Sequence, residues 1–144
     1  MKKVIGLLAI GIISMAFVVK NEKARIQEEG GIKFKNISLE KAKKESTDSG
    51  KLIFIDAHTS WCGPCKKMAA TSFKDAEVAE IYNEKFINLK IDCEKDADGP
   101  EISRLYKIKA YPTLLIIDGN GKLIKQIVGF QTADGLKAIA NSVD

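Results

Sequence analysis

The sequence has few of the residues on which disulfide-stapled or metal-stapled small proteins depend. It contains only three cysteines and one histidine in 144 residues. Three cysteines are too few for a disulfide scaffold, and a chain of this length can bury a core without one. A tetrahedral zinc site needs four ligands, usually from two cysteine pairs. This chain offers one pair, Cys62 and Cys65, with the spare Cys93 and His58, so structural zinc is a minor alternative.

The sequence also lacks a strong charge of one sign. Its 23 basic and 19 acidic residues give a formal net charge of +4, of which Lys2 and Lys3 supply two units. The short lysine pairs at 43–44 and 66–67 do not form the basic stripe of a nucleic-acid-binding protein. No phosphate loop, dinucleotide fingerprint, flavin site, internal repeat or low-complexity tract is visible. We therefore expect no bound cofactor, no metal and no nucleic-acid partner.

The N-terminus carries a strongly apolar run. Met1-Lys2-Lys3 is basic, an unbroken apolar stretch follows over 4–13, and 14–16 has the small-x-small pattern that a signal peptidase accepts. These features predict a signal peptide over residues 1–16 and hence export. Apolar residues resume directly afterwards, so an uncleaved anchor stays open, although the run falls short of the ~20 residues of a spanning helix. We expect a linker over 17–31 and a single domain over 32–144.

The pattern of the remaining chain predicts alternating strands and helices. We expect strands over 32–35, 51–57, 86–92, 113–117 and 123–128, the last two joined by an Asp-Gly-Asn-Gly turn. Helices are expected to begin at Ser38, just after Cys65, at Asp75, near Pro100 and at Thr132. This order predicts an α/β fold in which helices flank a mixed central sheet.

The segment Trp61–Cys65 places two cysteines where a buried strand gives way to a helix. Two cysteines separated by two residues can close a small disulfide ring. A sulfur at the start of a helix is near free backbone N–H groups and the positive end of the helix dipole, and both favour the thiolate. Cys62 should therefore attack a substrate disulfide, and Cys65 should resolve the mixed disulfide. A purely structural disulfide is the alternative, although so small a loop would stabilise the fold little.

With these residues the sequence resembles the thioredoxin superfamily from about residue 32 to the C-terminus. The segment Trp61–Cys65 is identical to the thioredoxin signature, and Asp56, six residues before Cys62, matches the buried acid of thioredoxins. Tyr111-Pro112-Thr113 matches the segment with a cis proline, and Gly129 matches the glycine after the last strand. The stretch 71–75 is similar to periplasmic thioredoxin-like domains, including the C-terminal domain of membrane thiol-reductant conductors.

The resemblance implies a thioredoxin fold and a thiol–disulfide oxidoreductase that reduces disulfides of exported, periplasmic proteins. It makes Cys62 and Cys65 the redox pair and Asp56 a proton acceptor for Cys65. The residues that it places in substrate binding are Trp61, Gly63, Pro64, Tyr111, Pro112 and Gly129. Disulfide-containing clients and a separate protein that supplies electrons are the implied partners. A disulfide oxidase or isomerase, and a binding module that makes no use of the thiols, remain open.

Two residues depart from the family pattern. His58 stands where thioredoxins usually have an aromatic residue, and it could either tune the thiolate or be an ordinary loop histidine. Asn88 stands where a lysine often lies near the buried acid, so we expect the Asp56 carboxylate to lack that stabilisation.

The third cysteine, Cys93, follows the end of a predicted strand, and we interpret it as a bystander thiol.

Overall fold

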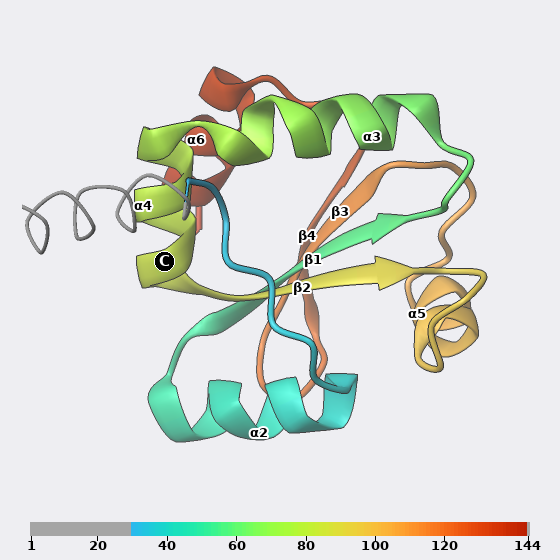
Figure 1. The fold of residues 1–144 in the computed structure, drawn as a ribbon. Coiled ribbons are helices and arrows are strands. Elements are labelled where there is room, and N and C mark those ends of the chain that lie inside the picture. Colours follow the sequence, from blue (N-terminus) through green and yellow to red (C-terminus); the bar gives the residue numbers. More distant parts are fainter. Residues whose placement is uncertain (1–29, 144) are drawn as a thin grey trace, which may run out of the picture. The chain divides into compact units, whose positions relative to one another are not determined.

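The structure is a computed structural model, and it describes residues 30–143 (Figure 1). The predicted signal peptide of residues 1–16 lies outside this range, as does the predicted linker of residues 17–31 apart from its last two glycines. Both stay predictions. None of the helices within the described range combines the length and the hydrophobicity needed to cross a lipid bilayer.

A four-stranded mixed sheet forms the centre of the fold. Its strands are β1 (Leu52–His58), β2 (Phe86–Asp92), β3 (Thr113–Ile117) and β4 (Leu123–Val128), in the spatial order β2-β1-β3-β4. β1 pairs with β2 in parallel and with β3 antiparallel, and β4 extends the antiparallel side. The bounds of β2, β3 and β4 are those that the sequence predicted, and β1 is displaced by one residue.

The prediction of a strand over residues 32–35 was wrong, because this segment belongs to no sheet. Its backbone groups bond to two different elements instead of to one neighbouring strand. The Ile32 N–H donates to the Phe73 carbonyl and the Lys35 N–H to the Asn88 carbonyl, both at 2.8 Å. Because these bonds do not repeat along one partner, no ladder forms.

Five α-helices and one 3₁₀ turn occur within residues 30–143. They are α2 (Leu39–Ser49), α3 (Gly63–Ala70), the 3₁₀ turn η1 (Ser72–Lys74), α4 (Ala76–Lys85), α5 (Gly99–Leu105) and α6 (Ala133–Asn141). As predicted, the side chains of Ser38, Asp75 and Thr132 cap their helices by accepting backbone N–H groups. α2 ends at Ser49, because Gly50 adopts φ +74° and its N–H closes the helix on the Ser46 carbonyl.

The sheet separates two hydrophobic clusters of buried side chains. In Figure 1, α3 lies above the sheet and α2 lies below it. Alternate residues of each strand face opposite layers. Phe54, Leu114 and Ile116 pack with residues of α3, α4 and α6, whereas Ile53, Ile55 and Leu115 pack with residues of α2 and α5. Asp56 and His58 follow Phe54 at spacings of two, so their side chains lie on the α3 face of β1.

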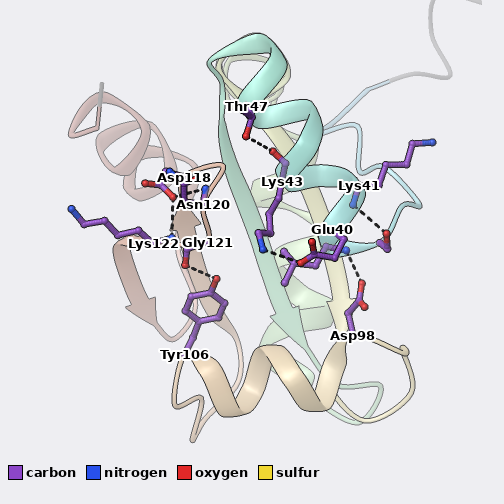
Figure 2. Close-up of polar contacts among 12 residues, drawn as sticks. Glu40, Lys41, Lys43, Thr47, Asp98, Tyr106, Asp118, Asn120, Gly121 and Lys122 are labelled. Atoms are coloured by element: carbon purple, nitrogen blue, oxygen red, sulfur yellow. Dashed lines mark hydrogen bonds and ion pairs between the residues drawn. The ribbon is translucent and has the colours of Figure 1, made fainter.

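Polar contacts join α2, α5 and the β3–β4 hairpin (Figure 2). An Asp98 carboxylate oxygen accepts the Leu39 N–H at 2.7 Å, which ties the start of α2 to the start of α5. At the other end of α5, the Tyr106 hydroxyl donates to the Gly121 carbonyl at 2.9 Å. These bonds anchor both ends of α5 and with them the loop that connects β2 to it.

Candidate active site

The redox pair lies at the N-terminus of α3, which begins inside the motif at Gly63. Cys62 is the N-cap, and its sulfur accepts the Cys65 N–H at 3.2 Å. A disulfide joins Cys62 to Cys65, with 5.3 Å between their Cα atoms. Both cysteines are buried, and Pro64 in the first turn removes one amide that would otherwise need a partner. The N–H that points at Cys62 and the helix dipole would both stabilise a Cys62 thiolate in the reduced form.

Asp56 is completely buried on the α3 face of β1. Neither of its carboxylate oxygens has a hydrogen-bond partner among the described residues. The Lys90 ammonium lies 3.8 Å from Oδ2. Burial raises the pKa of Asp56 to about 7, while the positive charge of Lys90 acts in the opposite direction. A carboxyl group in this state can exchange a proton near neutral pH.

Lys90 corrects an expectation drawn from the sequence. We expected Asp56 to have no lysine beside it, because Asn88 occupies the aligned position. In the structure Asp56 is opposite Lys90 in the β1–β2 register. Lys90 lies two residues after Asn88 on the same face of β2, and its ammonium group takes the place of the missing lysine beside Asp56. Asn88 instead donates to the Tyr82 carbonyl at 3.1 Å. Strand alternation could have pointed to Lys90, but only once the register was known.

Four of the six predicted substrate-binding residues are linked by direct contacts, and the other two, Gly63 and Pro64, lie in the first turn of α3. Trp61 is 65% exposed, and its ring meets the Tyr111 ring edge-on at 6.0 Å between centroids. The Tyr111–Pro112 peptide bond is cis, as the resemblance implied. The Gly129 N–H donates to the Pro112 carbonyl at 2.8 Å, and Gly129 has φ +99°, a conformation that favours glycine. The structure thus brings Trp61, Tyr111, the buried Pro112 and Gly129 together.

The profile of the thioredoxin-like domain matches residues 39–144 of the chain. The chain belongs to the thioredoxin-like family. A thioredoxin from Chlorobaculum thiosulfatiphilum is 36% identical over 85 residues, which cover 59% of this chain and 72% of that protein. A protein disulfide-isomerase from Datisca glomerata is 26% identical over 126 residues, covering 87% of this chain and 25% of the relative. The chain therefore spans about a quarter of that relative's length.

The chain is also similar to solved structures of thioredoxin-like proteins. This thioredoxin-like chain matches the solution structure of a proposed disulphide-isomerase from Bacteroides thetaiotaomicron with a TM-score of 0.69 and 37% identity. The match covers 80% of this chain and 97% of the other. The α/β thioredoxin fold predicted from the sequence is confirmed.

Sequence reasoning missed one further residue at the site of this thioredoxin-like protein. The Trp61 indole N–H donates to a Glu94 carboxylate oxygen at 3.0 Å. Glu94 follows β2 in the loop that leads to α5, and no motif in the sequence distinguishes it from other surface glutamates. It holds the exposed indole in place beside the cysteines.

His58 and Cys93 lie next to each other at the strand ends. The Cys93 N–H donates to the His58 carbonyl at 2.8 Å. Burial and the charge of Lys90 lower the pKa of His58, so its imidazole is mainly neutral at pH 7. Cys93 is a buried free thiol whose pKa is raised by burial, which leaves it a weak nucleophile. Among the described residues, no group of three or more His, Cys, Asp or Glu side chains could hold a metal ion.

Proposed function

We propose that the protein is a thiol–disulfide oxidoreductase that reduces disulfides of exported proteins through Cys62 and Cys65. One observation carries the proposal. The Cys62 sulfur caps α3 and accepts a backbone N–H, while Cys65 lies close enough to form a disulfide with it. A thiolate held at a helix start is the nucleophile that disulfide exchange needs.

The reaction proceeds in two exchange steps. The Cys62 thiolate attacks one sulfur of the client disulfide, which forms a mixed disulfide and releases the other client sulfur as a thiolate. Cys65 then loses its proton and attacks the Cys62 sulfur. This step forms the Cys62–Cys65 disulfide and releases the second client thiolate, which takes a proton from water. Two electrons pass from the cysteine pair to the client.

Asp56 is suited to accept the proton of Cys65 in the second step. Its pKa of about 7 lies close to physiological pH, where a general base is most effective. Lys90 keeps the carboxylate form accessible despite the complete burial of the side chain. We infer that Asp56 alternates between acid and carboxylate in each catalytic cycle.

The surface around Trp61 and Tyr111 is the proposed client-binding site. Trp61 offers a large exposed aromatic face, and Gly129 leaves open space where a side chain would otherwise project. An extended client segment that carries a disulfide could lie across this surface and present a sulfur to Cys62. The implied partners are such clients and a separate protein that restores the dithiol.

An oxidase or isomerase is the second candidate, because relatives with the name protein disulfide-isomerase match this chain. The reduction potential separates the two. A reductase should have a potential near that of thioredoxin, about −270 mV, whereas disulfide isomerase lies near about −180 mV. A potential above roughly −150 mV, without disulfide-reductase activity, would refute the reducing assignment.

Two variants test the cycle itself. Cys62→Ser should abolish client reduction, and Cys65→Ala should accumulate clients covalently bound to Cys62, because the resolving thiol is gone. The trapped proteins would identify both the clients and the electron donor. Full function in Cys62→Ser would instead indicate a binding module that makes no use of the thiols.

We also propose that the protein works in the periplasm. The support is the basic, apolar and small-x-small pattern of residues 1–16. Mass spectrometry of the mature N-terminus is the test. Cleavage after Ala16 is the expected result, and an intact Met1 in a soluble cytoplasmic fraction would defeat the proposal.

A further inference from the structure

A solvent-open cleft of about 510 Å³ lies beside the redox pair. Its walls come from the end of β1 and the turn after it, from α3 and from β2, and they include His58, Ser60, Cys65, Lys66 and Lys90. The aromatic residues of the proposed client surface are not among the described residues that line it. The cleft therefore connects Cys65 to solvent on a side other than the proposed client surface.

Asp56 is linked to this cleft through two of its wall residues, Lys90 and His58. The Lys90 side chain, part of the cleft wall, reaches within 3.8 Å of its carboxylate. In the proposed cycle Asp56 gains a proton from Cys65 and must lose it before the next turnover. The carboxyl group is completely buried, and both oxygens lack a hydrogen-bond partner among the described residues. Its proton therefore needs a carrier, and the cleft that Lys90 lines offers a route to water.

His58 is the wall residue whose chemistry suits that task. The ammonium groups of Lys66 and Lys90 have donors but no acceptor. The Thr59 and Ser60 hydroxyls have both but do not titrate near neutral pH, and Ser60 already donates to Asp92. A neutral imidazole has one of each and can take up a proton at one nitrogen while it releases another. His58 lies two residues after Asp56 on the same face of β1, and therefore on the cleft side of the strand.

The charges around His58 keep the imidazole able to accept. Lys90 faces it from β2, and together with burial it lowers the pKa of His58. Asp92, which is opposite His58 in the β1–β2 register, and Asp96 in the following loop act in the other direction. Asp92 is occupied by other donors, since it accepts the Ser60 hydroxyl at 2.7 Å and the Glu94 N–H at 3.0 Å.

We propose that His58 relays protons between Asp56 and solvent through water in this cleft. The inference rests on the proposed function and deepens it. Before the resolving step the Asp56 carboxyl passes its proton to the imidazole, which gives a carboxylate and an imidazolium, and the imidazolium then releases a proton to bulk water. The Asp56 carboxylate can then accept the proton of Cys65. No electrons move in this transfer. His58 does not touch the reacting sulfurs, so it is a positioning residue that acts through Asp56.

The test measures release of a fluorescent peptide thiol from a preformed mixed disulfide on Cys62. Release is followed from about pH 5 to about pH 9 in a buffer without imidazole. His58→Ala should slow release about tenfold at neutral pH, which is less than the effect of a direct general acid or base, about 10²-fold or more, because His58 acts through Asp56. Added imidazole should restore most of the rate, because the cleft can admit it. His58→Phe keeps a ring in place and should show the slow rate without rescue.

Two controls make the result specific. Imidazole should have no effect on the double variant Asp56→Asn with His58→Ala, since the group served by the relay is absent. Lys66→Gln changes the same wall at a residue without an acceptor, and it should keep the wild-type shape of the pH profile. If His58→Ala does not fold, as judged by its unfolding midpoint, the pH profile of His58→Phe decides the question.

Three results would overturn the relay: wild-type pH profiles in the His58 variants, no response of His58→Ala to imidazole, or rescue that persists without Asp56. These outcomes differ from a failure of the proposed function. If the wild-type protein never releases the peptide from Cys62, both proposals fail. If it releases the peptide and the His58 variants match it, only the relay fails.

Discussion

Replacement of Asp56 by asparagine should change how stability depends on pH. In the folded protein the buried carboxyl keeps its proton up to about pH 7, whereas its ordinary pKa is 3.8. Between these values the folded state holds a proton that the unfolded chain has lost. The free energy of unfolding must therefore fall as pH rises through this window. The penalty is absent below about pH 4 and complete above about pH 7.

The magnitude follows from the same two values. Each pKa unit corresponds to about 1.4 kcal/mol, so the gap between 3.8 and about 7 costs the wild type about 4 kcal/mol at alkaline pH. Asp56→Asn cannot ionise and avoids this cost. Its buried amide has a penalty of its own, but that penalty is the same at every pH and cancels when two pH values are compared.

Urea unfolding of the oxidised wild type and of Asp56→Asn, at about pH 4 and about pH 8, measures the difference. The free energy of unfolding of Asp56→Asn, relative to that of the wild type, should rise by about 4 kcal/mol from about pH 4 to about pH 8. Other titrating groups affect both proteins alike. A stability difference that varies by less than about 1 kcal/mol, or that falls with pH, would refute the assignment of Asp56 as a buried acid with a raised pKa.

Three further substitutions have defined outcomes. Lys90→Met should raise the pKa of Asp56 further, because it removes the charge that opposes the effect of burial, and the pH profile of client release should move to higher pH. Glu94→Ala should free the Trp61 indole, which would lower its fluorescence anisotropy and slow client attack, at a cost in stability below about 1 kcal/mol. Gly129→Ala should destabilise the fold by about 1–2 kcal/mol in thermal unfolding, since φ is +99° while a Cβ would meet open space. An unshifted profile, unchanged anisotropy and an unchanged Tm, respectively, would contradict them.

Local signals in the sequence predicted most of the fold. The bounds of β3 and β4 were marked by the Asp-Gly-Asn-Gly turn between them, and β2 was marked by the alternation of Ile87, Leu89 and Ile91. Those signals act within a few residues. The strand expected over 32–35 failed for the opposite reason. An apolar pattern shows that a segment can be extended, but a strand also needs a partner, and here Ile32 and Lys35 bond to different elements.

The candidate site divides in the same way. The sequence placed Cys62 near the start of a helix, although α3 begins at Gly63 and not after Cys65 as expected. The buried acid at Asp56 was implied by the resemblance, because the pattern of the strand alone did not decide it. Lys90 and Glu94 come from the end of β2 and the loop after it, and they meet Asp56 and Trp61 only through the strand register and the loop that α5 anchors. Contacts of this kind depend on the tertiary structure, so no local pattern in the sequence predicts them.

The rate of Cys62 alkylation as a function of pH tests the central claim most directly. The reduced protein is treated with iodoacetamide, and the adduct is located by mass spectrometry so that Cys65 and the buried Cys93 do not contribute. Because a backbone N–H and the start of α3 stabilise the thiolate, the midpoint of the Cys62 profile should lie at least one unit below about 8.5, the value of an ordinary cysteine. A midpoint at or above about 8.5 would contradict the account, since Cys62 would then be no better a nucleophile than an ordinary thiol.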